Sequence, residues 1–233
     1  DISGKGKSEL QEIINNSGLS ISFIDASSEG KELPDKDGGV GLARKIGMDY
    51  ALKVFDYNSE MKNIIVCLDA DSTVSTNYVQ EITDNFNQRN LNAAVVEYRH
   101  PVDNDINREA IICYEIFLRY YVLGLKYAGS PYAFHTIGST MACDYESYIK
   151  VEGMNKRKAA EDFYFMEKLA KHVNINRITN AFVYPSSRGS WRVPFGTGQR
   201  VNRFLSKVQN EYLLYNPKSF IILKEWLELF NTI

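Results

Sequence analysis

Strand-like and helical patterns alternate along the first hundred residues. Apolar positions at helical spacing predict helices over Ser8 to Asn16, Val40 to Phe55 and Thr76 to Gln88. Between them, strand patterns cover Ser20 to Asp25, Asn63 to Leu68 and Leu91 to Tyr98. This alternation predicts an α/β fold in which a mostly parallel, Rossmann-like central sheet is flanked by helices and joined by right-handed crossovers.

The second half of the chain is less regular. It predicts a long aromatic-rich helix over Arg108 to Tyr127, a short helix near Tyr145 to Val151, a helix over Glu161 to Ala170 and a strand over Asn174 to Tyr184. The Gly-, Ser- and Arg-rich segment Ser186 to Arg200 is expected to be a loop that folds over a ligand. Helices near Val201 to Tyr215 and Ser219 to Asn231 follow, with Pro217 marking the break between them. We expect a single domain over residues 1–233, made of two halves (1–100 and 101–200) and C-terminal helices (201–233).

Composition adds limits on partners and location. The chain has 233 residues, 44% of them hydrophobic, which is enough for a sizeable core, and a net charge of -2 with no basic block, so nucleic acid is not an expected partner. Cys67, Cys113 and Cys143 are widely spaced and odd in number, which favours a reducing compartment over a disulfide framework. No apolar run is long enough for a membrane span, so we expect a soluble, cytoplasmic domain.

The most informative chemistry lies in Leu68-Asp-Ala-Asp71, where the second strand ends. Two carboxylates one residue apart can turn toward one hard cation, since such cations prefer oxygen ligands. Asp25 ends the preceding predicted strand, and ligands of parallel sheets bind beyond the carboxyl ends of the strands. The alternative is a pair of solvated turn aspartates.

Two further segments carry candidate residues. Gly38 to Arg44 is a glycine-rich turn entering a helix, but Arg44 takes the place of the third glycine in Gly-x-Gly-x-x-Gly, so the dinucleotide fingerprint fails. Arg44 is therefore read either as a phosphate contact or as part of a solvated helix face. Glu161 and Asp162 open a predicted helix, where acidic residues are favoured by the helix dipole alone and where a carboxylate base is the functional alternative.

Together these segments resemble a known family. The series Ile24-Asp-Ala-Ser27, Gly41 to Ala51, Leu68 to Asp71, Gly138-Ser-Thr-Met-Ala142 with Gly153, and Glu161-Asp162 is similar, in order and spacing, to family 2 glycosyltransferases with the GT-A fold. The similarity covers roughly residues 20 to 170. It implies metal-dependent, inverting transfer of a hexose from a UDP- or GDP-linked sugar to a hydroxyl acceptor, such as a glycan, a lipid or a polysaccharide precursor.

The resemblance also implies residue roles. Asp25 and Ser27 would contact the nucleotide, Arg44 would lie near it, Asp69 would bind ribose or donor sugar, and Asp71, with Asp69, would hold Mn²⁺ or Mg²⁺. Asp162 would be the base that deprotonates the acceptor, supported by Glu161. Donor-site candidates also include Gly138, Ser139, Arg188 and Arg192.

Two departures from the family pattern stand out. No strand ending in a Pro-x-Tyr-Asn type turn precedes the first helix, which leaves the nucleotide base undetermined. Gln199-Arg-Val-Asn-Arg-Phe204 carries its arginine one place later than the Gln-x-x-Arg-Trp element of processive members, so processive synthesis is not supported.

Other interpretations stay open. Asp69-Ala-Asp-Ser-Thr-Val74 also fits the Asp-x-Asp-x-Thr-Val pattern of haloacid-dehalogenase-like phosphatases, with Asp69 as nucleophile. A third interpretation is an inert glycosyltransferase-like binding domain. The apolar face of the last helix would pack on the core of its own domain, on a partner such as a second copy of the chain, or on a membrane surface; the last would put the protein at the inner face of the membrane.

Overall fold

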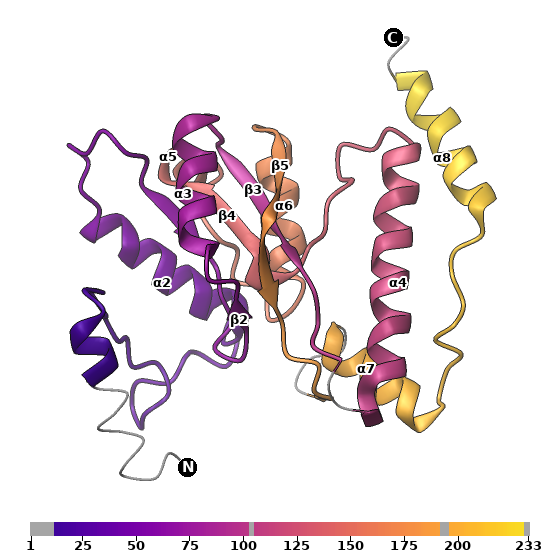
Figure 1. Cartoon of the computed structure of the whole chain (residues 1–233), viewed down its shortest axis with the longest axis horizontal. Coiled ribbons are helices and arrows are strands. Elements are labelled where there is room, and N and C mark those ends of the chain that lie inside the picture. The colour runs from indigo at the N-terminus through magenta and orange to yellow at the C-terminus, as the bar shows by residue number, and fades with distance from the viewer. Residues whose placement is uncertain (1–11, 103–104, 192–195, 231–233) are drawn as a thin grey trace. The chain divides into compact units, whose positions relative to one another are not determined.

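A computed structural model describes residues 12–102, 105–191 and 196–230 (Figure 1). The chain divides into two units, residues 1–32 and residues 33–233, which are described separately. In the first unit, residues 12–16 are helical and Gly18 follows with φ 69°, a left-handed conformation that suits a glycine after a helix. This agrees with the predicted first helix, whose residues 8–11 lie outside the described ranges.

The predicted strand Ser20 to Asp25 is wrong. Residues 19–26 have no regular secondary structure, and Phe23 is 87% exposed. A strand needs neighbours for its backbone N–H and C=O groups, and none of the described strands pairs with this segment. The alternation of side chains was therefore not enough to make a strand.

The second unit holds a five-stranded sheet in its described part, with the order β1-β4-β3-β5-β2. The strands are β1 (Ile64–Val66), β2 (Thr73–Val74), β3 (Ala93–Tyr98), β4 (Met141–Asp144) and β5 (Ile175–Tyr184). Among the described strands, only β3 and β5 pair in parallel; β1 with β4, β4 with β3, and β5 with β2 are antiparallel. The mixed α/β class is confirmed, but the prediction of a mostly parallel sheet is wrong.

The reason for this error is the position of β4. Because β1 and β3 both pair antiparallel with β4, and β3 pairs parallel with β5, the three predicted strands β1, β3 and β5 do run in one direction. The unpredicted β4 inserts between β1 and β3 in the opposite direction. The carboxyl ends of β1, β3 and β5 and the start of β4 consequently lie at the same edge of the sheet.

Helices cover both faces of this sheet (Figure 1). On one face, α2 (Val40–Val54), α5 (Tyr145–Lys150) and α6 (Glu161–Ala170) pack against a cluster that includes Ile65, Val95 and Met141. On the other face, α3 (Tyr78–Gln88) packs through the fully buried Phe86. Successive strand residues point to opposite faces, so β3 supplies Val95 to the first cluster and Val96 to the second.

The remaining helices pack on one another. Helix α4 (Asp105–Tyr127) contacts α7 (Thr197–Ser206) and α8 (Pro217–Phe230). Phe220 lies directly on Gly124, where a Cβ atom would collide with its ring. Pro217 is the first residue of α8, where its fixed φ and missing N–H fit. Helix α7 ends well before the predicted Tyr215, because Lys207 takes a left-handed conformation with φ 53°. None of the described helices is long and apolar enough to cross a membrane.

Candidate functional site

A cavity of about 820 Å³ opens among segments at the edge of the sheet where β1, β3 and β5 end. Its wall combines the glycine turn before α2, the turn after β1, the 3₁₀ turn η1 (Gly138–Thr140), the loop before α6, the loop after β5 and the start of α7. These segments are far apart in sequence. The cavity is therefore a product of the tertiary fold and lies where ligands of open α/β sheets bind.

Arg44 joins three of these segments. Its Nη2 donates to Oδ1 of Asp69 after β1, and its Nη1 donates to Oε1 of Glu161 at the start of α6. The side chains of Arg44 and Glu161 are 13% and 6% exposed, so their ion pair is shielded from water, whereas Asp69 is 43% exposed. Gly138 completes the arrangement, because a Cβ atom at this position would collide with the guanidinium group. A single cation thus fixes the positions of two acidic segments across the cavity.

Asp71 has a different partner. Its Oδ2 accepts a hydrogen bond from Nη2 of Arg188, in the loop after β5, at 2.6 Å. The two side chains are 39% and 59% exposed, and an ion pair this open to water contributes little to stability. The carboxylate of Asp71 can therefore exchange Arg188 for another cation at small cost.

Glu161 and Asp162 carry raised pKa values. Burial raises the pKa of the Glu161 carboxyl, the charge of Asp162 raises it further, and Arg44 opposes both effects. Burial also raises the pKa of Asp162, against the lowering effects of the Phe163 amide, which donates to Oδ1 at 2.7 Å, and of Arg44. Ala160, just before them, has φ 56°, a left-handed conformation that is costly for a residue with a Cβ atom. Strain and elevated pKa values coincide at this turn.

Helix N-termini surround the cavity. The N-cap residues of α2, α6 and α7 are Gly39, Ala160 and Gly196, and none of them caps its helix through a side chain. The Gly41 amide of α2 already donates to the C=O of Arg157 at 3.2 Å, and the Phe163 amide of α6 donates to Asp162, but the positive ends of the helix dipoles still favour anions. Lys158 also lines the wall, with its ammonium group donating to the backbone C=O of Asp35 at 2.5 Å. The wall thus offers anion-binding groups beside its carboxylates.

The donor set suits one kind of metal site. Within the described residues, no group of three or more His, Cys, Asp and Glu side chains is arranged to hold a metal ion. Asp69 and Asp71 supply carboxylate oxygens on one turn at the cavity wall. Mg²⁺ is commonly held by one or two carboxylates together with substrate phosphates, rather than by an all-protein cage. The residues present fit a divalent cation that arrives with a phosphate ligand.

Most of the predicted site residues meet in this cavity. Its wall includes Arg44, Asp69, Asp71, Gly138, Ser139, Glu161, Asp162 and Arg188. Ser139 is 1% exposed, and its hydroxyl has no hydrogen-bond partner in the described part of the chain. Arg192 lies outside the described residues.

Asp25 and Ser27 belong to the first unit. There Oδ1 of Asp25 accepts hydrogen bonds from the amides of Ser27 at 3.3 Å and Ser28 at 3.1 Å, and Oδ2 pairs with Lys31 at 3.2 Å. The hydrogen bonds from Ser28 are the main cause of the lowered pKa of Asp25. The role of Asp25 and Ser27 in nucleotide binding stays a prediction.

Several wall residues were not predicted from the sequence. Lys158 had a detectable signal, since it lies in the basic run Lys156-Arg-Lys158 before the acidic pair. Tyr114 was hidden among the aromatic residues of α4, and Thr197 within the segment predicted as a loop. No local pattern distinguishes these two residues from packing or loop residues.

A scan against protein-family models finds no match to this chain, and no curated protein sequence matches it.

Proposed function

We propose that this chain is a metal-dependent, inverting glycosyltransferase that moves a sugar from a nucleotide-sugar donor to a hydroxyl acceptor. One observation carries the proposal: the acidic turn after β1 and the acidic start of α6 line the same cavity and are joined by Arg44. A donor site and a base across one cavity are what such a transfer requires.

Asp162 is the base in this proposal. Its carboxylate takes the proton from the acceptor hydroxyl while that oxygen attacks the anomeric carbon from the face opposite the nucleotide. A general base works best when its pKa approaches the working pH, and burial shifts the pKa of Asp162 upward, in that direction. Glu161 has a supporting role, because its carboxylate holds Arg44 beside Asp69.

The donor diphosphate would lie against the opposite set of groups. Asp71 and Asp69 would hold Mn²⁺ or Mg²⁺, which supplies positive charge for the departing diphosphate. Arg188 pairs with Asp71 in this structure and is free to turn to a phosphate when Asp71 takes another cation. The start of α7 adds amide donors, and the start of α2 adds the positive end of its helix dipole.

The GT-A-like arrangement is part of the same proposal. It is supported by the common direction of β1, β3 and β5 and by a cavity at their carboxyl ends, although β4 and β2 make the sheet mixed. Helices on both faces of the sheet agree with it.

Ligand-dependent thermal stability tests the proposal. A panel of UDP-glucose, GDP-mannose and glucose 1-phosphate, each with and without Mn²⁺, should show a rise in Tm for at least one nucleotide sugar, larger with the metal, because a ligand that binds only the folded state stabilises it. Asp71→Asn should remove the metal dependence. Asp56→Asn, an exposed aspartate that does not line the cavity, should retain it.

Two outcomes would contradict the proposal. Equal stabilisation by glucose 1-phosphate alone would show that the nucleotide is not recognised. Hydrolysis of p-nitrophenyl phosphate without any response to nucleotide sugars would favour the phosphatase, in which Asp69 is the nucleophile.

A further inference from the structure

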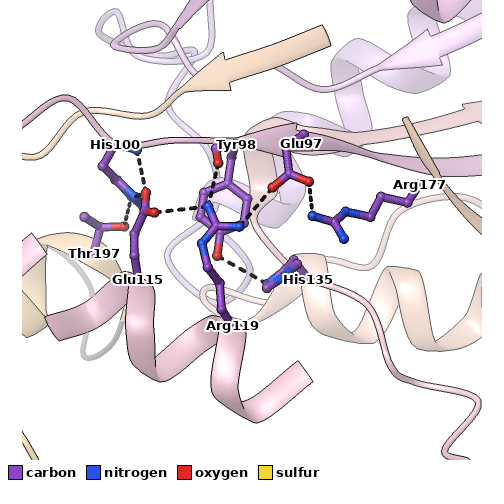
Figure 2. A network of polar contacts seen from close by, with 8 residues as sticks. All are labelled: Glu97, Tyr98, His100, Glu115, Arg119, His135, Arg177 and Thr197. Carbon is purple, nitrogen blue, oxygen red and sulfur yellow. Dashed lines mark hydrogen bonds and ion pairs between the residues drawn. The ribbon is translucent and has the colours of Figure 1, made fainter. Parts of the chain in front are cut away.

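A second polar cluster links the end of β3 to the wall of the cavity (Figure 2). Arg119 bridges Glu97, the backbone C=O of Tyr98 and Glu115, and at the end of the cluster nearest Thr197 lies His100, whose side chain is fully buried and uses both ring nitrogens. Nδ1 lies 3.0 Å from Oε1 of Glu115, and Nε2 lies 3.0 Å from Oγ1 of Thr197. The backbone amide of His100 also donates to Oε1 of Glu115, at 2.6 Å. A carboxylate, an imidazole and a hydroxyl are therefore joined by successive hydrogen bonds.

The direction of these hydrogen bonds follows from the charge of Glu115. Burial alone would raise its pKa, but hydrogen bonds from His100 and Arg119 lower the pKa to about 2. Glu115 is therefore ionised and can only accept. In the neutral imidazole the single hydrogen must then be on Nδ1, so Nε2 is an acceptor and Thr197 donates its O–H to it.

The hydrogen bond from Thr197 to His100 decides whether Thr197 can donate or accept on the side that faces the cavity. Thr197 is a wall residue and the first residue of α7. While the His100 ring is neutral, the only hydroxyl hydrogen of Thr197 is used by Nε2, so the Thr197 oxygen can offer nothing but lone pairs to a ligand. Tyr114 lies on the same wall, and burial raises its pKa to about 12 against the lowering effects of Arg200 and of a hydrogen bond with Thr197, so Tyr114 keeps its proton. A hydroxyl oxygen has two lone pairs, so Thr197 still has one for a ligand beside Tyr114, and this part of the wall suits a group that donates a hydrogen bond.

We propose that Thr197 accepts a hydrogen bond from a sugar hydroxyl of the donor, and that His100 and Glu115 are positioning residues that impose this polarity. The proposal rests on the proposed function and adds to it a residue that recognises the sugar rather than the diphosphate. Ionised phosphate oxygens have no hydrogen to donate, so Thr197 offers them no hydrogen bond.

Thr197→Val tests this inference, since it keeps the shape of the side chain and removes the hydroxyl. Binding is measured by titration calorimetry with Mn²⁺ for two matched pairs, UDP-glucose with UDP and GDP-mannose with GDP. For whichever pair binds, Thr197→Val should weaken the binding of the nucleotide sugar roughly tenfold, equivalent to about 1.4 kcal/mol. The affinity for the bare nucleotide should be unchanged. Thr197→Ser, which retains the hydroxyl, should bind like the wild type. A structural defect would instead weaken both members of the pair.

The remaining outcomes separate the two proposals. Equal losses for sugar nucleotide and bare nucleotide, or no loss at all, would overturn the role of Thr197 and leave the proposed function standing. A wild type that binds neither pair would overturn the proposed function, and this inference with it. Independently of any ligand, ¹⁵N NMR of the His100 ring at alkaline pH should show hydrogen on Nδ1 and none on Nε2; the opposite tautomer would overturn the inference.

Discussion

Two acidic clusters, one between β3 and α4 and one at the wall of the cavity, have carboxyl groups whose pKa values are shifted in opposite directions. In the network of Figure 2, Glu97 and Glu115 have lowered pKa values. At the cavity, Glu161 and Asp162 have raised ones. Burial acts on all four groups and cannot account for the difference. The difference lies in the cations that each cluster supplies.

The network is supplied with its own arginines. Glu97 pairs with Arg119, at 3.1 Å, and with Arg177, while Glu115 pairs with Arg119 and accepts a hydrogen bond from Nδ1 of His100. At the cavity, Arg44 is shared between Asp69 and Glu161, and Asp162 accepts only from a backbone amide among the described contacts. The network is thus a satisfied structural element, whereas the cavity holds acids available for a proton or a bound cation.

The largest expected effect concerns the pH dependence of stability. Because the folded-state pKa of Glu115 is about 2 against an ordinary 4.5, its contribution is present above pH 4.5 and is lost as pH falls toward 2. Glu115→Gln should lower the free energy of unfolding by about 3 kcal/mol at neutral pH. Urea unfolding at several pH values should show the gap to the wild type closing as pH falls below about 4.5. A gap independent of pH would contradict the assignment.

A smaller loss is expected when the network loses one charge without a change in shape. Glu97 is 7% exposed, but Arg119 and Arg177 are partly open to water, so Glu97→Gln should cost about 1 to 2 kcal/mol of unfolding free energy. The control is Glu167→Gln, which removes the exposed pair with Lys171 on α6 and should cost less than about 0.5 kcal/mol. A similar loss of unfolding free energy in Glu97→Gln and Glu167→Gln would contradict a structural role for the network.

Gly138→Ala tests whether the position of Arg44 at the cavity matters for ligand binding. The added methyl group would meet the Arg44 guanidinium, the movable end of a flexible side chain, so the stability cost should be only about 1 kcal/mol. Binding of the nucleotide sugar should weaken, because Arg44 is displaced from Asp69 and Glu161. Gly47→Ala, where a Cβ meets nothing within 4 Å inside α2, should instead raise stability by about 0.5 to 1 kcal/mol and leave binding unchanged. Identical behaviour of the two variants would remove Arg44 from the site.

Local patterns were sufficient for most helices and for the strands that are long or well bounded. The apolar run before Asp69 became β1, and the periodic stretch ending near Ala170 became α6. Met141 to Asp144 was missed as a strand because four residues carry too little periodicity, and this omission concealed the antiparallel pairings. Ser20 to Asp25 has the alternation of a strand but no described partner.

Some features of the site could likewise be predicted from local sequence patterns, whereas others could not. Asp71 and Asp162 were predicted because acids at a strand end and at a helix start have recognisable contexts. The ion pair between Arg44 and Glu161 joins residues far apart in sequence, so only the fold reveals it. The same holds for the hydrogen bond between His100 and Thr197, which decides how Thr197 faces the cavity.

The most direct measurement is the turnover of Asp162→Asn with the nucleotide sugar that stabilises the wild type, in parallel with its Tm. A raised folded-state pKa means that this group stabilises the fold at low pH and that the contribution is lost as pH rises through the folded-state value. At neutral pH the neutral side chain should therefore keep or slightly raise Tm. Transfer should fall by at least about 100-fold, the usual contribution of a general base, with donor binding retained. Turnover close to that of the wild type, or a loss of stability like that of Glu97→Gln, would contradict the account.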